Sequence, residues 1–470
     1  MKKIVLIPCV MLLSACSLMP DYLRPDMSVP TEWPVAPSSE ANTLDSTGKP
    51  AWGEVAWKEF FTDASLQELI QKALDNNRDL RVAALNIEVA RASYRVAEAD
   101  LLPRVDAGMS GTGQRTPRDL SQAMPKEART THQYNANLSV TAFELDLFGR
   151  YRSLNQQALE SYLATEEARN ATQIALIAEV ANAYLTLLGD RKQLALSEKT
   201  MATRQKSYEL IERRLELGMS NELDRAQART AVESARTNQA RYIRLVEQDI
   251  NALQLLVGAP INRAAPTIEL DSMQLVQDMP VGLPSDVLLR RPDIMQAEHA
   301  LKATNANIGA ARAAFFPRIS LTALAGFASP ALSSLFDADS RTWSFVPGIT
   351  VPIFDAGRNQ ANLEASKANR EIAVARYEKA IQSAFREVSD GLVARGTLVS
   401  QVEAQKALVD AADTSYRLSN ARYRQGIDNY LAVLDAERSL YSAQQDLIQV
   451  QVQRLSNLVT LYKVLGGGRT

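Results

Sequence analysis

Few residues of this 470-residue chain have the types and spacing that catalysis or metal binding needs. The two histidines, His132 in a polar loop and His299 in a predicted helix, have no Cys, Asp or Glu at ligand spacing, so no metal site is expected. The run Gly466-Gly467-Gly468 has no strand before it and no helix after it, unlike a phosphate-binding loop. No Gly-x-Ser-x-Gly nucleophile motif occurs. The sequence therefore predicts neither an enzyme nor a cofactor.

One group of residues at the start of a predicted helix could instead shape a pore. Leu431 and Asp435 are four residues apart and share a helix face, and Arg438 lies one turn further on. If three chains met on an axis, this face would present a ring of leucines and a ring of aspartates, a constriction both apolar and anionic. The alternative is an exposed helix start with an ordinary ion pair between Asp435 and Arg438.

These residues belong to the second copy of an internal repeat. Gly357, Gly426 and Gly466 correspond to Gly149, Gly218 and Gly258 at one offset of 208 residues, and the apolar residues between them repeat at the same offset. An offset held without a gap over more than a hundred residues indicates two structurally equivalent halves.

Each half contains a very long helix. The segments Arg150 to Leu217 and Arg358 to Gln425 contain no proline, and at ~1.5 Å per residue each would extend about 100 Å. Apolar residues recur at intervals of seven in the first segment, which predicts coiled-coil packing. The residues of that heptad series are Val180, Leu187, Leu194, Met201, Tyr208 and Leu215.

Each long helix ends at a glycine that we expect to form a tight turn into a returning helix. Gly218 and Gly426 stand where a left-handed backbone ends a helix. We expect Asn221 in the first copy and Asp428 in the second to begin the returning helices.

Each half also contains two segments of alternating polarity joined by a polar loop, which predicts a β-hairpin. The first hairpin lies within residues 103–148, after a predicted helix from Ser65 to about Leu102, with its loop from Gln114 to Gln133. The second lies within residues 317–354. One hairpin taken alone would favour the alternative interpretation, in which it forms half of a small soluble sheet.

Three features together favour membrane strands over a soluble sheet. The strands are ~10 residues long, which is enough to cross a bilayer at a tilt. Aromatic residues cluster near the strand ends, and the N-terminus resembles an export signal. Four strands cannot close a barrel, since about eight is the minimum, so several chains must contribute to one barrel. No later segment is predicted to be a membrane-spanning helix, because even the apolar stretch Ala171 to Leu188 carries Gln173, Glu179 and Asn182.

The N-terminus has the pattern of a targeting segment. Lys2 and Lys3 precede an apolar run from Ile4 to Leu13, and Leu13-Ser14-Ala15-Cys16 resembles a bacterial lipobox. That resemblance implies cleavage before Cys16 and lipidation of this residue, and Ser17 after it resembles outer-membrane sorting. The alternative is an ordinary secretory signal with a chance cysteine.

The composition fits long helices and argues against nucleic acid as a partner. Hydrophobic residues make up 46% of the chain, charged residues 23% and aromatic residues 6%, and the formal net charge is -2. The predicted organisation is a signal (1–15), a lipidated tether and lead-in (16–64), a first repeat (65–258), a linker (259–284), a second repeat (285–466) and a short tail (467–470).

Several motifs together resemble one known family, the TolC-like outer-membrane factors, and most closely its lipidated OprM-like branch. The similarity covers essentially the whole chain after the signal. The motifs are Leu13-Ser14-Ala15-Cys16, Phe143-Glu144-Leu145-Asp146-Leu147-Phe148-Gly149-Arg150, Leu283-Pro284-Ser285-Asp286, Arg290-Arg291-Pro292-Asp293, Ala310-Ala311-Arg312-Ala313-Ala314-Phe315-Phe316-Pro317 and Leu465-Gly466-Gly467-Gly468.

The resemblance implies a mainly helical homotrimer in the outer membrane of a Gram-negative cell. Its twelve-stranded barrel would continue into a periplasmic α-helical barrel, forming the exit duct of a tripartite efflux pump with a periplasmic adaptor and an RND-type transporter. It also implies a periplasmic gate at residues matching Leu431 and Asp435, with Arg438 as a further partner. We expect the turns at Gly218, Asn221, Gly426 and Asp428 to contact the adaptor. The alternatives are a lipid-anchored periplasmic spacer or adaptor, and an exit duct for secreted peptides or proteins.

Overall fold

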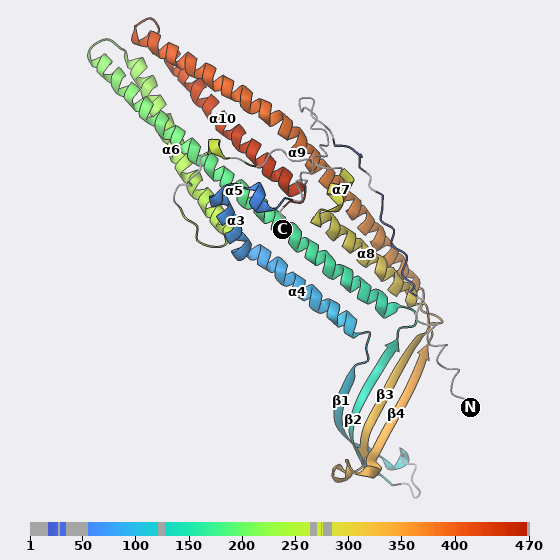
Figure 1. Cartoon of the computed structure of the whole chain (residues 1–470). Helices are drawn as coiled ribbons and strands as arrows, with labels where there is room; N and C mark the ends of the chain where they lie inside the picture. Colours follow the sequence, from blue (N-terminus) through green and yellow to red (C-terminus); the bar gives the residue numbers. More distant parts are fainter. Residues whose placement is uncertain are drawn as a thin grey trace. The chain divides into compact units, whose positions relative to one another are not determined.

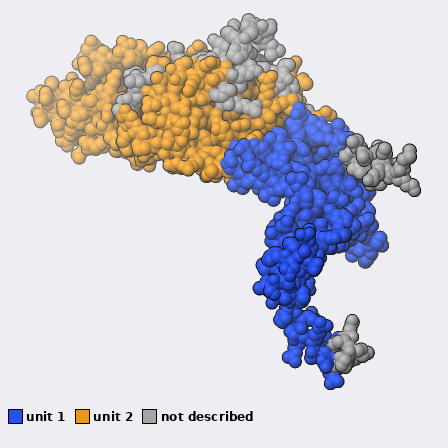
Figure 2. All heavy atoms as spheres, turned by 60° about the horizontal axis from the view of Figure 1, so that its bottom comes forward, with its two compact units in different colours: residues 1–25, 87–165, 297–377 blue, residues 26–86, 166–296, 378–470 orange. Residues whose placement is uncertain are grey.

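The computed structural model describes residues 17–26, 29–33, 55–120, 127–263, 270–273, 275 and 284–467. The predicted signal, the predicted lipidation residue Cys16, and most of the predicted tether and inter-repeat linker lie outside these residues. The described residues form two compact units (Figure 2). Those within 1–25, 87–165 and 297–377 belong to unit 1, and those within 26–86, 166–296 and 378–470 belong to unit 2.

Unit 1 contains one antiparallel sheet of four strands in the order β1-β2-β3-β4 (Figure 1). The strands are β1 (Val105–Thr116), β2 (Arg129–Leu145), β3 (Arg318–Ser329) and β4 (Arg341–Thr350). The two predicted hairpins are therefore present, and β2 also pairs with β3, so both repeats contribute to a single sheet. The first hairpin loop is shorter than predicted, because β1 continues to Thr116 and β2 begins at Arg129. The 3-10 turns η2 (Arg118–Leu120), η4 (Leu332–Ser334) and η5 (Ala338–Ser340) lie in the two hairpin loops.

A β-bulge interrupts the alternation of side chains along β2. Strict alternation would place Ala142 on the same face as Val140, but the register passes from Val140 opposite Ala323 to Phe143 opposite Leu321. Ala142 adopts a positive φ of 50° at this point, and its backbone N–H donates to Thr322 Oγ1 at 3.2 Å. The extra residue returns Phe143, rather than Ala142, to the apolar face.

The long helices repeat at the predicted offset. α5 spans Arg150–Glu216 and α9 spans Arg358–Arg424, each 67 residues long. The returning helices are α6 (Glu222–Val257) and α10 (Tyr430–Val464). All six glycines with positive φ form three pairs at the 208-residue offset among the described residues. The turn geometry is therefore duplicated along with the helices.

One described helix, α5, is long and apolar enough over an 18-residue window to cross a membrane by length and composition alone. The mean hydropathy of this window is 1.3, and 56% of it is buried within the chain. Its apolar residues from Leu176 to Leu188 belong to the main core of unit 2. This burial identifies the window as a core helix segment.

The helix predicted from Ser65 to Leu102 is two helices, α3 (Ala64–Asn76) and α4 (Arg78–Ala99). Asn77 separates them with extended backbone, at φ −62° and ψ 133°. Its side-chain Oδ1 accepts from the Leu80 N–H at 2.9 Å, which caps α4, and its Nδ2 donates to the Leu256 carbonyl of α6 at 2.8 Å. The break depends on this contact with α6, which the local sequence pattern does not reveal.

The core of unit 2 lies where α3, α5, α6 and α10 pack together. The aromatic lead-in residues pack against this core through α2 (Trp57–Phe60). The Phe60 ring stacks on the Tyr462 ring, with the ring centroids 4.2 Å apart. The Tyr462 hydroxyl donates to the Val55 carbonyl at 2.8 Å. The lead-in residues are therefore integrated into the core.

Arg291 of the motif Arg290-Arg291-Pro292-Asp293 contacts the end of α10. It lies between the short helix α7 (Pro284–Leu289) and α8 (Pro292–Ala313), and its side chain is 8% exposed. Its guanidinium donates to the Val464 carbonyl at the end of α10 at 2.8 Å and pairs with Asp293 and Glu387. A buried cation here satisfies a terminal carbonyl that the helix leaves without a partner.

Candidate functional site: the helical turns and the strand faces

The two turns between the long and the returning helices have the same backbone geometry. Gly218 and Gly426 have φ of 70° and 76°, in the left-handed region that favours glycine. In the first turn, Met219 N–H donates to the Arg214 carbonyl at 2.7 Å and Gly218 N–H donates to Leu215 at 2.9 Å. The second turn repeats both bonds one offset later. These reverse hydrogen bonds end each long helix sharply.

The side chains at the two turns differ. In the first, Asn221 caps α6 by accepting from the Asp224 N–H at 2.8 Å, as predicted. In the second, Asn429 rather than Asp428 caps α10, accepting from the Ala432 N–H at 3.2 Å. The predicted helix start at Asp428 is therefore wrong, and Asn429 is the repeat equivalent of Asn221.

Asp428 instead forms an ion pair with Arg422, which precedes the turn. Arg422 Nε and Nη2 donate to the two carboxylate oxygens at 2.6 and 3.0 Å. The hydrogen bond from Arg422 lowers the pKa of Asp428. The first turn has Arg214 and Ser220 at the equivalent positions, so it cannot form this bidentate ion pair.

The three predicted gate residues lie on the first turns of α10. Leu431 is 47% exposed although it is a large apolar side chain. Asp435 pairs with Arg438 at 3.5 Å, and both side chains are more than 60% exposed. In a single chain the ordinary ion pair is thus present, and Leu431 and Asp435 remain available to a partner.

An apolar cluster next to these residues joins the turn region of the first repeat to that of the second. Tyr430 packs with Ile211 of α5 and Ala228 of α6, and its ring lies 5.5 Å from that of Tyr423. The Arg214 guanidinium of the first repeat lies 5.0 Å from the Tyr423 ring centroid. Burial raises the pKa of Tyr430. The start of α10 is therefore anchored against the first repeat.

A buried ion pair links α5 to α10 close to this cluster. Arg204 Nε donates to Glu437 Oε1 at 2.8 Å, and the two side chains are 7% and 10% exposed. Arg204 Nη1 also donates to the Ala231 carbonyl of α6 at 3.1 Å. One guanidinium thus connects three helices from both repeats.

The sheet of unit 1 has one continuous apolar face. Cross-strand partners point to the same side of a sheet, so the register defines rows across it. Five alternate rows are dominated by apolar side chains. These rows are Met109, Ala136, Phe327 and, at the end of β4, Arg341; Ala107, Leu138, Ala325 and Trp343; Val105, Val140, Ala323 and Phe345; Phe143, Leu321 and Pro347; and Leu145, Ile319 and Ile349.

The rows between them form a face of mostly polar and small side chains. Asn137, for example, pairs with Gly108 and Gly326, and Gly326 has no room for a Cβ because the Ala136 carbonyl would lie 2.2 Å from it. Met109, Leu138 and Trp343 on the apolar face are 57–78% exposed within the chain. The described part of the chain therefore leaves the apolar face uncovered.

A short N-terminal segment, residues 17–25, runs antiparallel to α8. Arg24 pairs with Glu298 at 2.9 Å, Asn305 donates to the Pro20 carbonyl at 2.8 Å, and Arg312 donates to the Leu18 carbonyl at 3.1 Å. Each contact lies about two turns further along α8 as the chain is followed from Arg24 back to Leu18. The segment is therefore fixed in register along α8.

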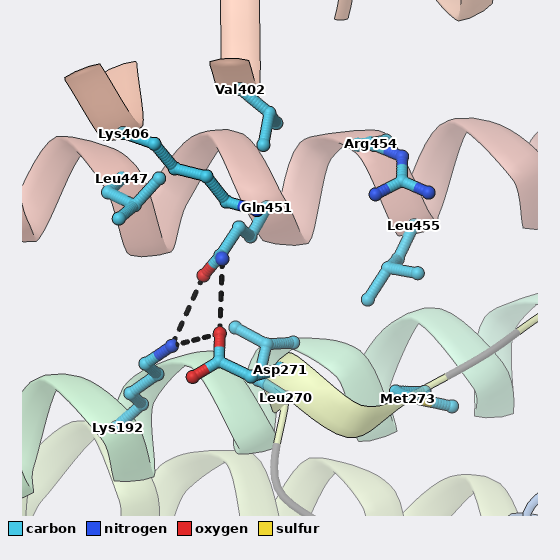
Figure 3. Close-up of a pocket in the computed structure, with 10 residues that line it drawn as sticks. All are labelled: Lys192, Leu270, Asp271, Met273, Val402, Lys406, Leu447, Gln451, Arg454 and Leu455. Atoms are coloured by element: carbon cyan, nitrogen blue, oxygen red, sulfur yellow. Dashed lines mark hydrogen bonds and ion pairs between the residues drawn. The ribbon is translucent and has the colours of Figure 1, made fainter. Parts of the chain in front are cut away.

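A cavity of about 370 Å³ lies between α5, α9, α10 and the short turn η3 (Leu270–Ser272) of the inter-repeat linker (Figure 3). Lys192 of α5 pairs with Asp271 of η3 and donates to Gln451 of α10 at 3.2 Å, and Gln451 also donates to Asp271 at 3.0 Å. Lys406 and Arg454 also line the cavity. The linker carboxylate thus ties the two repeats together.

No group of three or more His, Cys, Asp or Glu side chains that could hold a metal occurs among the described residues. His299 instead contacts Glu160 of α5, with Nδ1 and Oε2 2.7 Å apart. The sites that the structure does define are the turns, the start of α10 and the two faces of the sheet.

Comparison with known proteins identifies this arrangement. The model of the family described as outer membrane efflux protein matches residues 69–259 and 283–467. The chain belongs to the outer membrane efflux protein family.

Two relatives from Pseudomonas putida, the antibiotic efflux pump outer membrane protein ArpC and the toluene efflux pump outer membrane protein TtgC, are each 53% identical over 459 residues. That alignment covers 97% of this chain and 93% of theirs. The open state of the Neisseria gonorrhoeae MtrE outer membrane channel is 37% identical and has a TM-score of 0.87, over 97% of this chain and 99% of that one. This outer membrane efflux protein accordingly has a role in transport at the outer membrane of a Gram-negative cell.

Sequence reasoning missed three features of this outer membrane efflux protein. Asn429 could have been found, because the 208-residue offset maps Asn221 onto it. The pair of Arg204 and Glu437 has no such signal, because it depends on how two helices distant in sequence pack together. The contacts of residues 17–25 with α8 likewise arise from tertiary packing alone.

Proposed function

We propose that three copies of this chain form one closed duct, with four strands from each copy in a twelve-stranded outer-membrane barrel. The observation that carries this proposal is the apolar face that crosses all four strands, combined with two unpaired sheet edges. β1 and β4 each pair on one side only among the described strands. Open edges are not tolerated in a bilayer, so pairing of β1 with β4 of a neighbouring copy is the solution that closes the sheet.

The two faces of the sheet have separate roles in this proposal. The apolar rows face lipid, with Trp343 and Phe345 among their exposed residues, and the polar rows face a water-filled lumen. The long helices of the three copies form a periplasmic α-helical barrel continuous with the strands. The heptad spacing of α5 supports coiled-coil packing there.

The periplasmic end of the duct closes, in our proposal, around Leu431 and Asp435. Three copies on an axis would place three exposed leucines and three exposed aspartates around one opening. Arg438, which pairs with Asp435 within the chain, would moderate the negative charge of that ring. Opening would require the starts of the α10 helices to move apart.

Cys16 carries the lipid anchor in this proposal. The segment from residue 17 to residue 25 is held along α8 and leads towards the end of that helix, which precedes β3. The lipobox resemblance of Leu13-Ser14-Ala15-Cys16 supports acylation, and the register along α8 supports an anchor attached close to the membrane strands.

The partners are a periplasmic adaptor and an inner-membrane transporter of the RND type. The turns that bear Gly218, Asn221, Gly426 and Asp428 are the adaptor contacts we propose. The duct itself conducts passively, because its partners supply the energy. The relatives named for antibiotic and toluene efflux support small organic toxicants as substrates.

The alternatives are a lipid-anchored periplasmic spacer and a duct for secreted peptides or proteins. The uncovered apolar face counts against a soluble spacer, because an apolar surface that crosses four strands would cause the protein to aggregate if it were exposed to water. The names of the relatives count against secretion.

Two neighbouring residues of β2 test the barrel. Leu138→Asp places a charge on the apolar face, and Asn137→Asp places the same charge on the polar face as a matched control. We expect Leu138→Asp to abolish heat-resistant trimers on gels and channel activity in planar bilayers, because a carboxylate in lipid is costly. Asn137→Asp should retain both. A full-length protein that stays a water-soluble monomer would refute the barrel.

A further inference from the structure

Charged side chains occur at only one end of the apolar face of the sheet. Among the residues of the described strands, Arg115 of β1 and Arg341 of β4 are the only Arg, Lys, Asp or Glu side chains on that face. Arg341 lies in the row of Met109, and Arg115 is an even number of residues from Met109 along β1. Both arginines lie at the hairpin end of the sheet, whereas the end that joins the helices has apolar residues such as Val105 and Ile349.

The two arginines lie on the two edge strands of the sheet. β1 and β4 each pair on one side only among the described strands. In the barrel, β4 of one copy lies beside β1 of the next, so each seam between copies receives Arg341 from one copy and Arg115 from the other. The inference that follows therefore rests on the trimeric barrel proposed above.

The lengths of the edge strands determine which residues pair at this seam. β4 has 10 residues and β1 has 12. Since antiparallel partners run in opposite directions, all of β4 pairs with β1 only if Arg341 lies opposite residue 114, 115 or 116 of the next copy. Cross-strand partners share a face, and of these three only residue 115 lies on the apolar face. Full pairing of the backbone, which a bilayer requires, therefore places Arg341 opposite Arg115.

The side chains next to this pair fit the same register. Trp343 lies opposite Gly113 of the next copy, two positions further along the strands. The next position on the same face places Phe345 opposite Gly111. On the other side of Gly113, the His132 ring of the same chain lies so close that a Cβ on the glycine would be 3.3 Å from its Nδ1. Large rings therefore lie opposite glycines at this seam, an arrangement that covers an edge glycine with a cross-strand ring.

Two guanidinium groups that lie directly opposite each other repel. Like charges at cross-strand positions destabilise a sheet, and a low dielectric beside lipid strengthens the repulsion. Both Arg115 and Arg341 are exposed, and neither pairs with a carboxylate of its own chain among the residues that the structure describes. An anion between the two groups would remove the repulsion and accept hydrogen bonds from both. The seam therefore favours binding of an anion.

We propose that each seam binds a phosphate of lipid A, the phosphorylated glucosamine lipid in the outer leaflet of Gram-negative outer membranes. The two arginines are on the face that contacts lipid. They are at the outer end of the strands, because the helices continue into the periplasm from the other end. The planar guanidinium of arginine matches the geometry of phosphate oxygens. Trp343 adds an aromatic ring next to the pair, as is common where a membrane protein meets the lipid headgroups.

Thermal dissociation of the full-length trimer tests this site. Trimers purified in detergent and freed of lipid would be heated with and without lipid A, and the trimers that survive would be measured on denaturing gels. We expect lipid A to raise the dissociation temperature of the native trimer by several degrees, because it binds only the assembled seam. Arg115→Gln with Arg341→Gln should lose most of this shift. Arg129→Gln removes an arginine from the opposite face at the same end and should keep the shift.

The choice of ligand separates the lipid from its parts. Lipid A without its phosphates should give little shift, and inorganic phosphate at the same concentration should give none. An equal shift with dephosphorylated lipid A would show that the acyl chains alone bind, and this would overturn the proposal. A full shift with inorganic phosphate, or a shift that survives in the double variant, would overturn it as well.

Reversal of one charge tests the pairing of the two arginines. Arg115→Glu would face Arg341 of the next copy and form an ion pair with it. This trimer should resist heat better than the native one in the absence of lipid A, and lipid A should raise its dissociation temperature less. Arg115→Glu with Arg341→Glu restores like charges and should reverse the gain. A lower heat resistance for Arg115→Glu than for Arg115→Gln would contradict the register.

A cysteine pair measures the register directly. Arg115→Cys with Arg341→Cys should give covalent dimers and trimers with a short thiol cross-linker, whereas Gln114→Cys with Arg341→Cys should not, because residue 114 lies on the polar face. The native cysteines, Cys9 and Cys16, lie in the predicted signal and at the proposed lipid anchor. Trimers that form without this cross-link would show that the register is wrong. Failure of the barrel is recognised separately, because the native chain would then form no trimers.

Discussion

The turns of the two repeats have the same backbone geometry but differ in some of their side chains. Both turns have a left-handed glycine, two reverse hydrogen bonds and an asparagine cap. Yet Asp435 of the second repeat corresponds to Gln227 of the first, although Leu431 and its equivalent Leu223 are the same residue type. The comparison teaches that the positions that fix the turn are the same in both repeats, whereas polar positions differ, and the gate proposed above depends on one of them.

The largest expected difference between the repeats, in the free energy of unfolding, concerns the buried ion pair of Arg204 and Glu437. Arg204→Met alone leaves Glu437 buried without a partner and should reduce the free energy of unfolding by ~3–5 kcal/mol. Replacing both residues with apolar ones should cost far less. Arg229→Met, at the exposed repeat equivalent of Glu437, should change stability by no more than ~0.5 kcal/mol.

Guanidinium unfolding at one fixed protein concentration would measure all three variants, since assembly makes apparent stability depend on concentration. Equal losses for Arg204→Met and Arg229→Met would show that the two repeat positions do not differ in the way the structure indicates.

The second prediction concerns the proposed gate. Leu431→Ser combined with Asp435→Ser should raise the conductance of the purified protein in planar bilayers on the order of tenfold, because the constriction loses its bulk and its charge. Leu223→Ser with Gln227→Ser changes the equivalent positions of the first repeat and should leave conductance unchanged. An unchanged conductance in both would count against a gate at α10.

The third prediction tests whether the turns are equivalent in backbone alone. Gly218→Ala and Gly426→Ala should each destabilise by ~1–2 kcal/mol, because an added Cβ is strained at positive φ. No atom lies within 4 Å of either added Cβ, so no clash contributes. Thermal unfolding would compare them, and a much larger loss at one turn would show that its side chains also determine its backbone.

The smallest expected effect is a pH dependence of stability that comes from Asp249 of the first repeat. Burial, together with the neighbouring Asp190, raises the pKa of Asp249 to about 6, above the ordinary value of about 3.9. The folded chain therefore binds this proton more tightly than the unfolded chain. Its stability should decrease as the pH rises from about 4 to about 6 and stay lower above that range.

Asn457 stands at the equivalent position of the second repeat and donates to the Gly391 carbonyl at 3.0 Å. Asp249→Asn should reduce the pH dependence and raise the unfolding temperature at pH 7.5. The part that remains comes from Asp190, because burial also raises the pKa of that carboxyl. Unfolding temperatures measured between pH 4 and pH 8 would check this, and an unaltered slope in the variant would assign the dependence to another group.

Much of the fold follows from local sequence. The ends of α5 and α9 were predicted to within a residue, because proline is absent between a starting glycine and an ending glycine. The break at Asn77 and the cap at Asn429 were not. Asn77 interrupts a continuous helical pattern because its side chain bonds to the Leu256 carbonyl of α6, a partner 179 residues away.

The site was predictable only in part. The turn glycines and Asn221 have local signals, and Leu431 and Asp435 share a helix face whatever surrounds them. The continuous apolar face of the sheet depends on register between strands and on the bulge at Ala142, neither of which alternation alone determines.

The contact of the N-terminal segment with α8 has a consequence for biosynthesis. Arg24 and Glu298 are 274 residues apart, so Arg24 leaves the ribosome long before its partner is made. Synthesis and folding proceed from the N-terminus. An export machinery would therefore meet residue 16 before α8 has been made, and the acylation that we propose at Cys16 can be finished before α8 holds the neighbouring residues.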